Sequence, residues 1–329
     1  MAKLSIEYCR SLFAEIGDVY IEHYLEEIKG DDKDLREIDQ EYGNIEKALE
    51  QLIAYDLGTT LDKETKQAYL QEYVLALANY WTVRGGQYWN QVVELSTRLI
   101  DELPVSGTVS LHLSHYHNLA RIFYRFGDYE RAFTVIEEGI ESVRKGHLEE
   151  ERILAHLLYM KSAIYRKTGD YELARRACLQ SLEQMESWKD IKGQAIAYYN
   201  LGALDQETGE ASNLHTAKTY LEKSVQIFSN LGMKERIARS CIRLAQIGLQ
   251  EKDFQTSAER LQEARAYLTT ETLARPHVQL ELVTAAFYYH QNNLQLARET
   301  AYFGIKLAKS QKLTIELEEF NDLLKCIGP

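Results

Sequence analysis

The sequence predicts an all-α protein, an α-solenoid in which helix hairpins repeat at intervals of about 40 residues. The 329 residues include only three prolines, and this scarcity favours long uninterrupted helices. No alternating run of β-branched residues is bounded by turn signals, so no strand is predicted. One pattern recurs along the chain: an amphipathic helix, a Gly-Asp turn and the start of a second helix, as at Gly127-Asp128 and Gly169-Asp170.

An N-terminal helical hairpin is expected over residues 1–60. Residues 4–29 carry apolar side chains at three- to four-residue spacing, and Gly30 closes this first helix. The acidic run at 31–34 then opens a second helix, because carboxylates favour the positive end of a helix. Apolar residues between Leu35 and Leu52 line one face of the second helix, and Leu57-Gly58 ends it.

A degenerate first repeat is expected over residues 61–103. Its two helices, at about 63–83 and 88–102, flank a glycine turn, and Trp81 precedes this turn as Phe123 and Tyr165 precede theirs. Residues 103–107 contain Pro104 and form the clearest linker in the chain.

Five repeats are expected over residues 108–312. One small residue follows each turn, and the intervals between these residues are 42, 43, 40 and 40. The five small residues are Ala132, Ala174, Ala217, Ser257 and Ala297. A small side chain at this position lets the two helices of a hairpin approach closely. The third repeat is expected to carry extra residues in its turn at 211–214, and a last helix over 313–329 caps the final apolar face.

The charge balance bears on the partner. Asp and Glu number 50 against 38 Lys and Arg, which gives a formal net charge of −12. Nucleic acids and anionic membranes attract proteins with positive fields, so this balance argues against both as partners.

The cysteines and the N-terminus bear on localisation. Cys9, Cys178, Cys241 and Cys326 stand far apart with no CxxC pair, and we interpret Cys178 and Cys241 as buried reduced thiols. The N-terminus lacks the apolar core of a signal peptide, and no stretch is apolar enough to span a membrane. A cytoplasmic protein is expected.

The recurring residues resemble the tetratricopeptide repeat family. The resemblance is carried by Gly127-Asp128-Tyr129 with Ala132, by Gly169-Asp170-Tyr171 with Ala174 and by Asn200-Leu201-Gly202, and it covers roughly residues 65–310. The family's standard repeat has about 34 residues, so the helices here are longer. The resemblance implies a right-handed α-solenoid of tetratricopeptide-like helix hairpins.

A narrower resemblance concerns the N-terminal part. Residues 39–49 and 81–85 are similar to helices that precede the repeat array in bacterial multidomain signalling NTPases and transcriptional activators. The chain would then be the sensor arm of such a protein, since no GxxxxGK[ST] phosphate-binding loop is present. Whether it is complete or part of a larger protein stays open.

No catalytic or metal-binding constellation is recognised, so we expect neither an enzyme nor a bound cofactor. His112, His115 and His117 cannot all lie on one face of a helix, and a metal site there is not expected. Paired acids such as Glu137-Glu138 are typical of solvated helix faces. A helical-repeat hydrolase would need inward carboxylates, whereas the inner face is basic.

The resemblance implies a concave groove lined by the first helix of each repeat. The candidate ligand-binding residues are His117, Asn118, Arg121, Tyr124, Arg125, Tyr159, Arg166, Lys167, Tyr199, Asn200, Arg239 and Arg243. Over four helices this face holds six Lys or Arg and one acid, Glu207. Asn118 and Asn200 stand where family members hold the backbone of a bound peptide. The expected ligand is a protein or peptide that is acidic or presents a carboxylate or phosphate. The alternative is that these arginines pair with acids of neighbouring helices.

Two functional hypotheses follow. The first is a non-catalytic scaffold or sensor that binds a peptide or protein in bacterial signalling. The second is a cytosolic peptide receptor that regulates a response regulator or transcription factor through an acidic N-terminal ridge formed by Glu15, Asp18, Glu22 and Glu26. Whether the chain forms a homodimer stays open, since terminal repeats of solenoids can pair.

Overall fold

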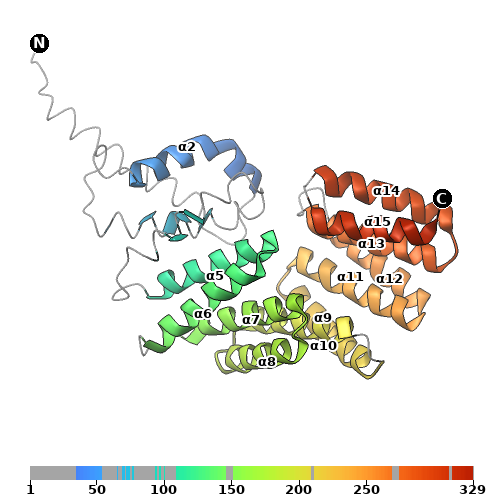
Figure 1. The fold of residues 1–329 in the computed structure, drawn as a ribbon, viewed down its shortest axis with the longest axis horizontal. Helices are drawn as coiled ribbons and strands as arrows, with labels where there is room; N and C mark the ends of the chain where they lie inside the picture. The colour runs from blue at the N-terminus through green and yellow to red at the C-terminus, as the bar shows by residue number, and fades with distance from the viewer. Residues whose placement is uncertain are drawn as a thin grey trace, which may run out of the picture. The chain divides into compact units, whose positions relative to one another are not determined.

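The computed structural model describes residues 35–53, 109–145, 151–208, 211–268, 274–310 and 313–328, with scattered positions between 65 and 100. The chain divides into two compact units, Met1–Ile153 and Leu154–Pro329. All regular secondary structure in the described residues is α-helical (Figure 1), which confirms the all-α prediction.

In the N-terminal unit, the structure describes α2 (Leu35–Ile53) and the hairpin of α5 (Val109–Phe126) with α6 (Tyr129–Lys145). Helix α2 corresponds to the helix predicted after the acidic run, and Ile38, Ile45 and Ala48 on it are buried. The helix expected at 4–29, the acidic ridge on it and most of the degenerate repeat lie outside the described residues.

The C-terminal unit is a series of helix hairpins followed by one terminal helix (Figure 1). The hairpins are α7 (Glu151–Thr168) with α8 (Tyr171–Ser187), α9 (Ile191–Thr208) with α10 (Ala211–Asn230), α11 (Lys234–Glu251) with α12 (Phe254–Tyr267), and α13 (Ala274–His290) with α14 (Leu294–Ser310). Successive hairpins are in contact, because α8 packs on α9, α10 on α11 and α12 on α13. This stacking of helix hairpins confirms the solenoid within the unit.

The turns of the α5–α6, α7–α8, α11–α12 and α13–α14 hairpins share one backbone geometry. Gly127 and Gly169 have φ angles of 80° and 88°, and Lys252 and Asn292 take the same left-handed region at 61° and 59°. In each turn the following N–H returns to a helix carbonyl, as in the 2.9 Å hydrogen bond from Asp170 N to Tyr165 O. The Gly-Asp pattern is therefore weak at Lys252 and Asn292 because another residue replaces glycine, while the turn itself is kept.

The small residues that follow the turns are fully buried. Ala132, Ala174, Ala217, Ser257 and Ala297 each expose 0% of their surface. Gly202 on α9 adds to this close contact, because a Cβ atom there would lie 2.6 Å from Leu221 Cγ on α10. Small side chains thus set the approach of the helices within a hairpin, as the repeat interval predicted.

One expectation about the third repeat is wrong. Residues 211–214 do not lengthen the turn; they form the first turn of α10, which has 20 residues. Leu214 is buried in a cluster with Ala217 and Leu221, at helical spacing. Burial of this leucine favours helix over loop.

The terminal helix α15 (Thr314–Ile327) packs on α13 and α14. Phe320 on α15 is fully buried against Val278, Ala285, Ala301 and Ala308. The ring fits because Gly304 on α14 carries no side chain where a Cβ atom would clash with it. Helix α15 therefore covers the apolar face of the last hairpin.

The described cysteines are free thiols. Cys178 and Cys241 are buried, which confirms the interpretation from sequence, while Cys326 is exposed. Burial raises the pKa of both buried thiols to about 12, so neither is a reactive thiolate at neutral pH. Cys9 lies outside the described residues.

Candidate ligand-binding face

The first helices of three hairpins, α7, α9 and α11, bring several predicted site residues together. Arg166 comes from α7, Tyr199 and Glu207 from α9, and Arg239 and Arg243 from α11. We call these five residues the arginine cluster. All five lie in the C-terminal unit.

Glu207 is the acid that two arginines share. Arg166 Nη1 donates to Glu207 Oε1 at 2.5 Å, and Arg243 Nη2 donates to the same oxygen at 3.0 Å. Arg243 Nη1 also donates to Gln206 Oε1 at 2.7 Å. Arg166 and Arg243 therefore form internal ion pairs, the alternative that the sequence left open for these arginines.

The charges around Glu207 change its acidity. Burial alone would raise the pKa of Glu207, but the positive charges of Arg166, Arg243 and Lys167 outweigh it and hold the pKa below the usual value. Glu207 is therefore ionised at neutral pH.

Tyr199 lies among the same arginines. The guanidinium carbon of Arg239 is 5.6 Å from the centroid of the Tyr199 ring, within the range of a cation–π contact. Burial alone would raise the pKa of Tyr199, but the charges of Arg239, Arg243 and Arg166 lower it to about 7. The lowered pKa of the Tyr199 phenol is a consequence of the local excess of positive charge.

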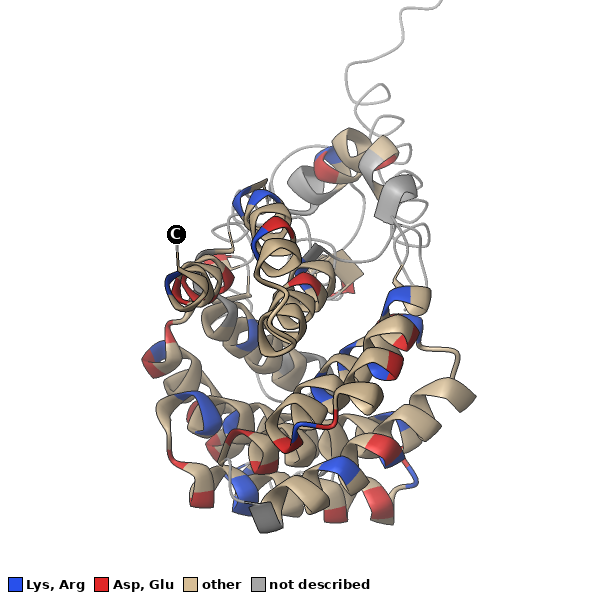
Figure 2. Cartoon of the chain, turned by 90° about the vertical axis from the view of Figure 1, so that its right-hand side faces the viewer, with Lys and Arg blue, Asp and Glu red and all other residues tan. Residues whose placement is uncertain are grey.

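This excess can be stated residue by residue. Charged residues of both signs occur along the described helices (Figure 2), yet here Arg236, the three arginines of the cluster and Lys167 outnumber the glutamates whose charges act on them, Glu207, Glu235 and Glu319. Of these glutamates, Glu235 lies 3.9 Å from Arg239, beyond hydrogen-bond distance. Among the described residues, Arg239 is thus the arginine of the cluster with the weakest carboxylate partner.

Two buried hydrogen-bond donors, one on α9 next to Tyr199 and one in the arginine cluster itself, have no acceptor among the described residues. Asn200 on α9 exposes only 8% of its surface, and its Nδ2 makes no hydrogen bond to any described residue. Arg166 is also buried, and its Nε likewise makes no hydrogen bond to any described residue. A buried donor without an acceptor costs free energy.

The other predicted residues are distributed as follows. Tyr159 on α7 is partly buried against the core of the unit, and Lys167 is exposed at the end of the same helix. His117, Asn118, Arg121 and Tyr124 lie on α5 in the N-terminal unit, where Asn118 is buried and the Tyr124 ring lies 5.6 Å from that of Tyr129. The side chain of Arg125 lies outside the described part of the chain.

Sequence reasoning missed Arg236. It precedes Arg239 by three residues on α11, so helical spacing alone could have placed it beside the groove face. Its pKa is lowered by burial and by the charge of Arg239, which shows that it adds to the same positive region.

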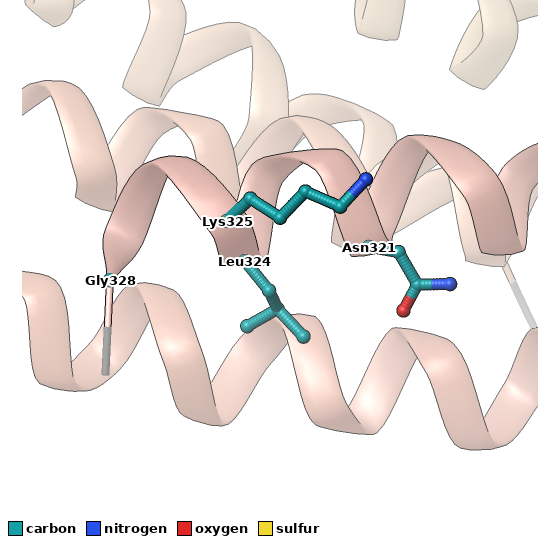
Figure 3. Close-up of a pocket in the computed structure, with 4 residues that line it drawn as sticks. All are labelled: Asn321, Leu324, Lys325 and Gly328. Atoms are coloured by element: carbon teal, nitrogen blue, oxygen red, sulfur yellow. The ribbon is translucent and has the colours of Figure 1, made fainter.

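A separate shallow pocket lies at the end of α15. Its lining consists of Asn321, Leu324, Lys325 and Gly328 (Figure 3). The ammonium group of Lys325 pairs with Asp322 at 2.7 Å, and the pocket gathers no cluster of polar groups. The arginine cluster is therefore the better candidate site.

The described residues contain no group of three or more His, Cys, Asp or Glu placed to hold a metal ion. None of their helices is long and apolar enough to cross a membrane.

The fold defines a helical-repeat protein. A family model described as tetratricopeptide repeat matches residues 155–184, which fall in the α7–α8 hairpin. The chain thus contains a tetratricopeptide repeat, as the resemblance predicted. No curated protein sequence matches the chain.

Solved structures show the same fold at low sequence identity. A Rap protein complexed with competence and sporulation factor is 13% identical, with a TM-score of 0.66 over 93% of this chain and 80% of that one. NprR in complex with its cognate peptide NprX is 13% identical, with a TM-score of 0.60 over 95% and 83%. A signal transduction ATPase with a tetratricopeptide repeat sensor from Pyrococcus horikoshii is 17% identical, with a TM-score of 0.56 over 93% and 48%.

Proposed function

We propose that this chain is a non-catalytic regulatory scaffold that binds an acidic peptide or protein segment on the face formed by α7, α9 and α11. The observation that carries the proposal is the excess of arginine in the cluster, together with the unsatisfied donor of Asn200. A guanidinium fork binds a carboxylate with two parallel hydrogen bonds. The side-chain amide of Asn200 suits a backbone carbonyl of the same ligand.

Arg239 is the proposed first contact for the ligand's carboxylate. Its side chain is 29% exposed, and its guanidinium lies over Tyr199 with its carboxylate partner, Glu235, at 3.9 Å. Arg243 and Arg166 continue the positive surface toward Lys167. An extended peptide along this surface would meet positive charge from three successive hairpins.

Fold neighbours support a peptide ligand. The Rap structure contains competence and sporulation factor, and the NprR structure contains the peptide NprX. These structures also favour the second candidate function, a peptide receptor. In that proposal the receptor passes its signal to a response regulator or transcription factor. We place either form in the bacterial cytoplasm, where the free thiols Cys178 and Cys241 would stay reduced.

Selection from a phage-displayed library of linear heptapeptides tests the proposal. We expect clones rich in Asp and Glu, and we expect the strongest clone, synthesised with a fluorescent label, to bind Arg239→Gln about tenfold more weakly than wild type. Arg176→Gln is the matched control, because Arg176 is exposed on α8 outside the cluster. Selection of no acidic clone, or equal binding by Arg239→Gln, would contradict the proposal.

A further inference from the structure

The ion pair of Glu207 differs from the other deep ion pairs in the C-terminal unit. In the pairs Arg175–Asp205 and Arg275–Glu316, each acid side chain is only 3% exposed and the arginine is the outer member. In the pair Arg166–Glu207 the order is reversed, with 8% exposure for the arginine side chain and 24% for the acid. The carboxylate of Glu207 is therefore the solvent-accessible member that covers a buried cation.

A buried arginine needs a counter-ion, but the counter-ion need not come from the same chain. Leaving Arg166 without any carboxylate partner would create an uncompensated buried charge, which costs free energy. Exchanging one carboxylate for another keeps the pair intact. Because Glu207 can be reached from solvent, such an exchange needs no opening of the core.

The position of Glu207 on α9 favours release. Glu207 is the residue before the last one of the helix, where unpaired carbonyl groups give the helix end a partial negative charge. A carboxylate at this end is disfavoured by the helix. Arg166 and Arg243 keep the carboxylate of Glu207 in place despite the partial negative charge of the helix end. A carboxylate from a ligand would not be repelled by this charge, so it would compete well for the same arginines.

We propose that Glu207 is an internal stand-in for the ligand, and that a carboxylate of the bound peptide replaces it on Arg166 and Arg243. This inference rests on the proposed function and adds a mechanism of regulation to it. In the free protein Glu207 fills the anion subsite. Binding then exchanges one carboxylate for another and releases Glu207 to solvent, so ligands without an anionic group cannot displace it.

The proposal predicts that removing the charge of Glu207 tightens ligand binding. When Glu207 occupies the subsite in most molecules, the apparent affinity for the peptide equals the intrinsic affinity multiplied by the small fraction of free subsites. Removing the charge of Glu207 raises this fraction and therefore the apparent affinity. We expect Glu207→Gln to bind the labelled acidic heptapeptide selected on wild type about three- to tenfold more tightly. Glu207→Asp, whose shorter side chain reaches the arginines less well, should show a smaller gain.

Glu222→Gln is the matched control. Glu222 on α10 also pairs with an arginine, Arg260 at 3.5 Å, but its side chain is 47% exposed and lies outside the arginine cluster. This substitution makes the same change in net charge and should leave the affinity unchanged. The selected peptide with an amidated C-terminus distinguishes a terminal carboxylate from a side-chain carboxylate as the displacing group.

Each outcome separates this inference from the proposed function. Equal or weaker binding by folded Glu207→Gln, with wild type still binding, would overturn the exchange and leave the peptide face intact. Equal tightening by Glu207→Gln and Glu222→Gln would also overturn it, because the effect would then be one of net charge. Absence of binding to wild type would overturn the proposed function itself. Circular dichroism and thermal unfolding check the fold, and Glu207→Asp serves if Glu207→Gln does not fold.

Discussion

Tyr199 shows at the scale of one residue how the arginine cluster changes chemistry. A phenol ordinarily ionises near pH 10, but here Arg239, Arg243 and Arg166 lower the pKa to about 7. A tyrosinate would supply negative charge that the cluster lacks. Measuring the pKa of Tyr199 therefore tests directly whether this face carries an excess of positive charge.

We predict one tyrosine ionisation with a midpoint near pH 7 in wild type and none in Tyr199→Phe, measured as the difference in absorbance near 295 nm. Because the folded pKa lies below the unfolded one, ionised Tyr199 stabilises the fold. This contribution is complete above about pH 10 and is lost as pH falls through about 7. Wild type should thus gain stability relative to Tyr199→Phe between pH 7 and 10. An unchanged difference over that range would contradict the excess of positive charge.

The residues of the cluster could be predicted from sequence only in part. The resemblance to tetratricopeptide repeats assigned Arg166, Arg239 and Arg243 to one face, and the structure brings these three together. The sharing of Glu207 could not be predicted, because it depends on side-chain conformations across three helices. Helical spacing also says nothing of depth, so the burial of Arg166 and Asn200 appeared only in the structure.

At the scale of the element, glycines and small residues decide how helices meet. The contact of Gly304 with Phe320 docks the terminal helix α15 on α14. Sequence periodicity predicted this helix but not its partner glycine. The start of α10 at Ala211 was likewise not predicted, because four residues that resemble a turn become helical once Leu214 is buried.

We predict that Gly304→Ala destabilises the docking of α15 by about 1–3 kcal/mol, because the added methyl group would overlap the buried Phe320 ring. Thermal unfolding and limited proteolysis of the terminal helix measure the effect. Phe303→Ala is the control, since Phe303 on the same helix is 54% exposed. If Gly304→Ala and Phe303→Ala both resist the protease as wild type does, the contact between Gly304 and the Phe320 ring does not determine the docking of α15.

At the scale of the C-terminal unit, the repeat interval reappears in the long-range contacts. Arg166 and Glu207 are 41 residues apart, Gln206 and Gln246 are 40 apart, and Arg275 and Glu316 are 41 apart. An interval of about 40 residues in the sequence thus becomes a contact between equivalent positions of neighbouring hairpins. This regular interval is why the fold class was predictable from the sequence, whereas the ligand was not.

Photo-crosslinking tests the central claim, binding of an acidic peptide on the face of α7, α9 and α11, most directly. A photoreactive amino acid replaces either Gln246, whose side chain meets Gln206 at 3.4 Å beside the cluster, or Leu179, which is 42% exposed on α8. Each protein is irradiated with the labelled acidic heptapeptide. The account predicts a crosslink from position 246 and none from position 179. A crosslink from position 179 alone would place the ligand on another surface and contradict the account.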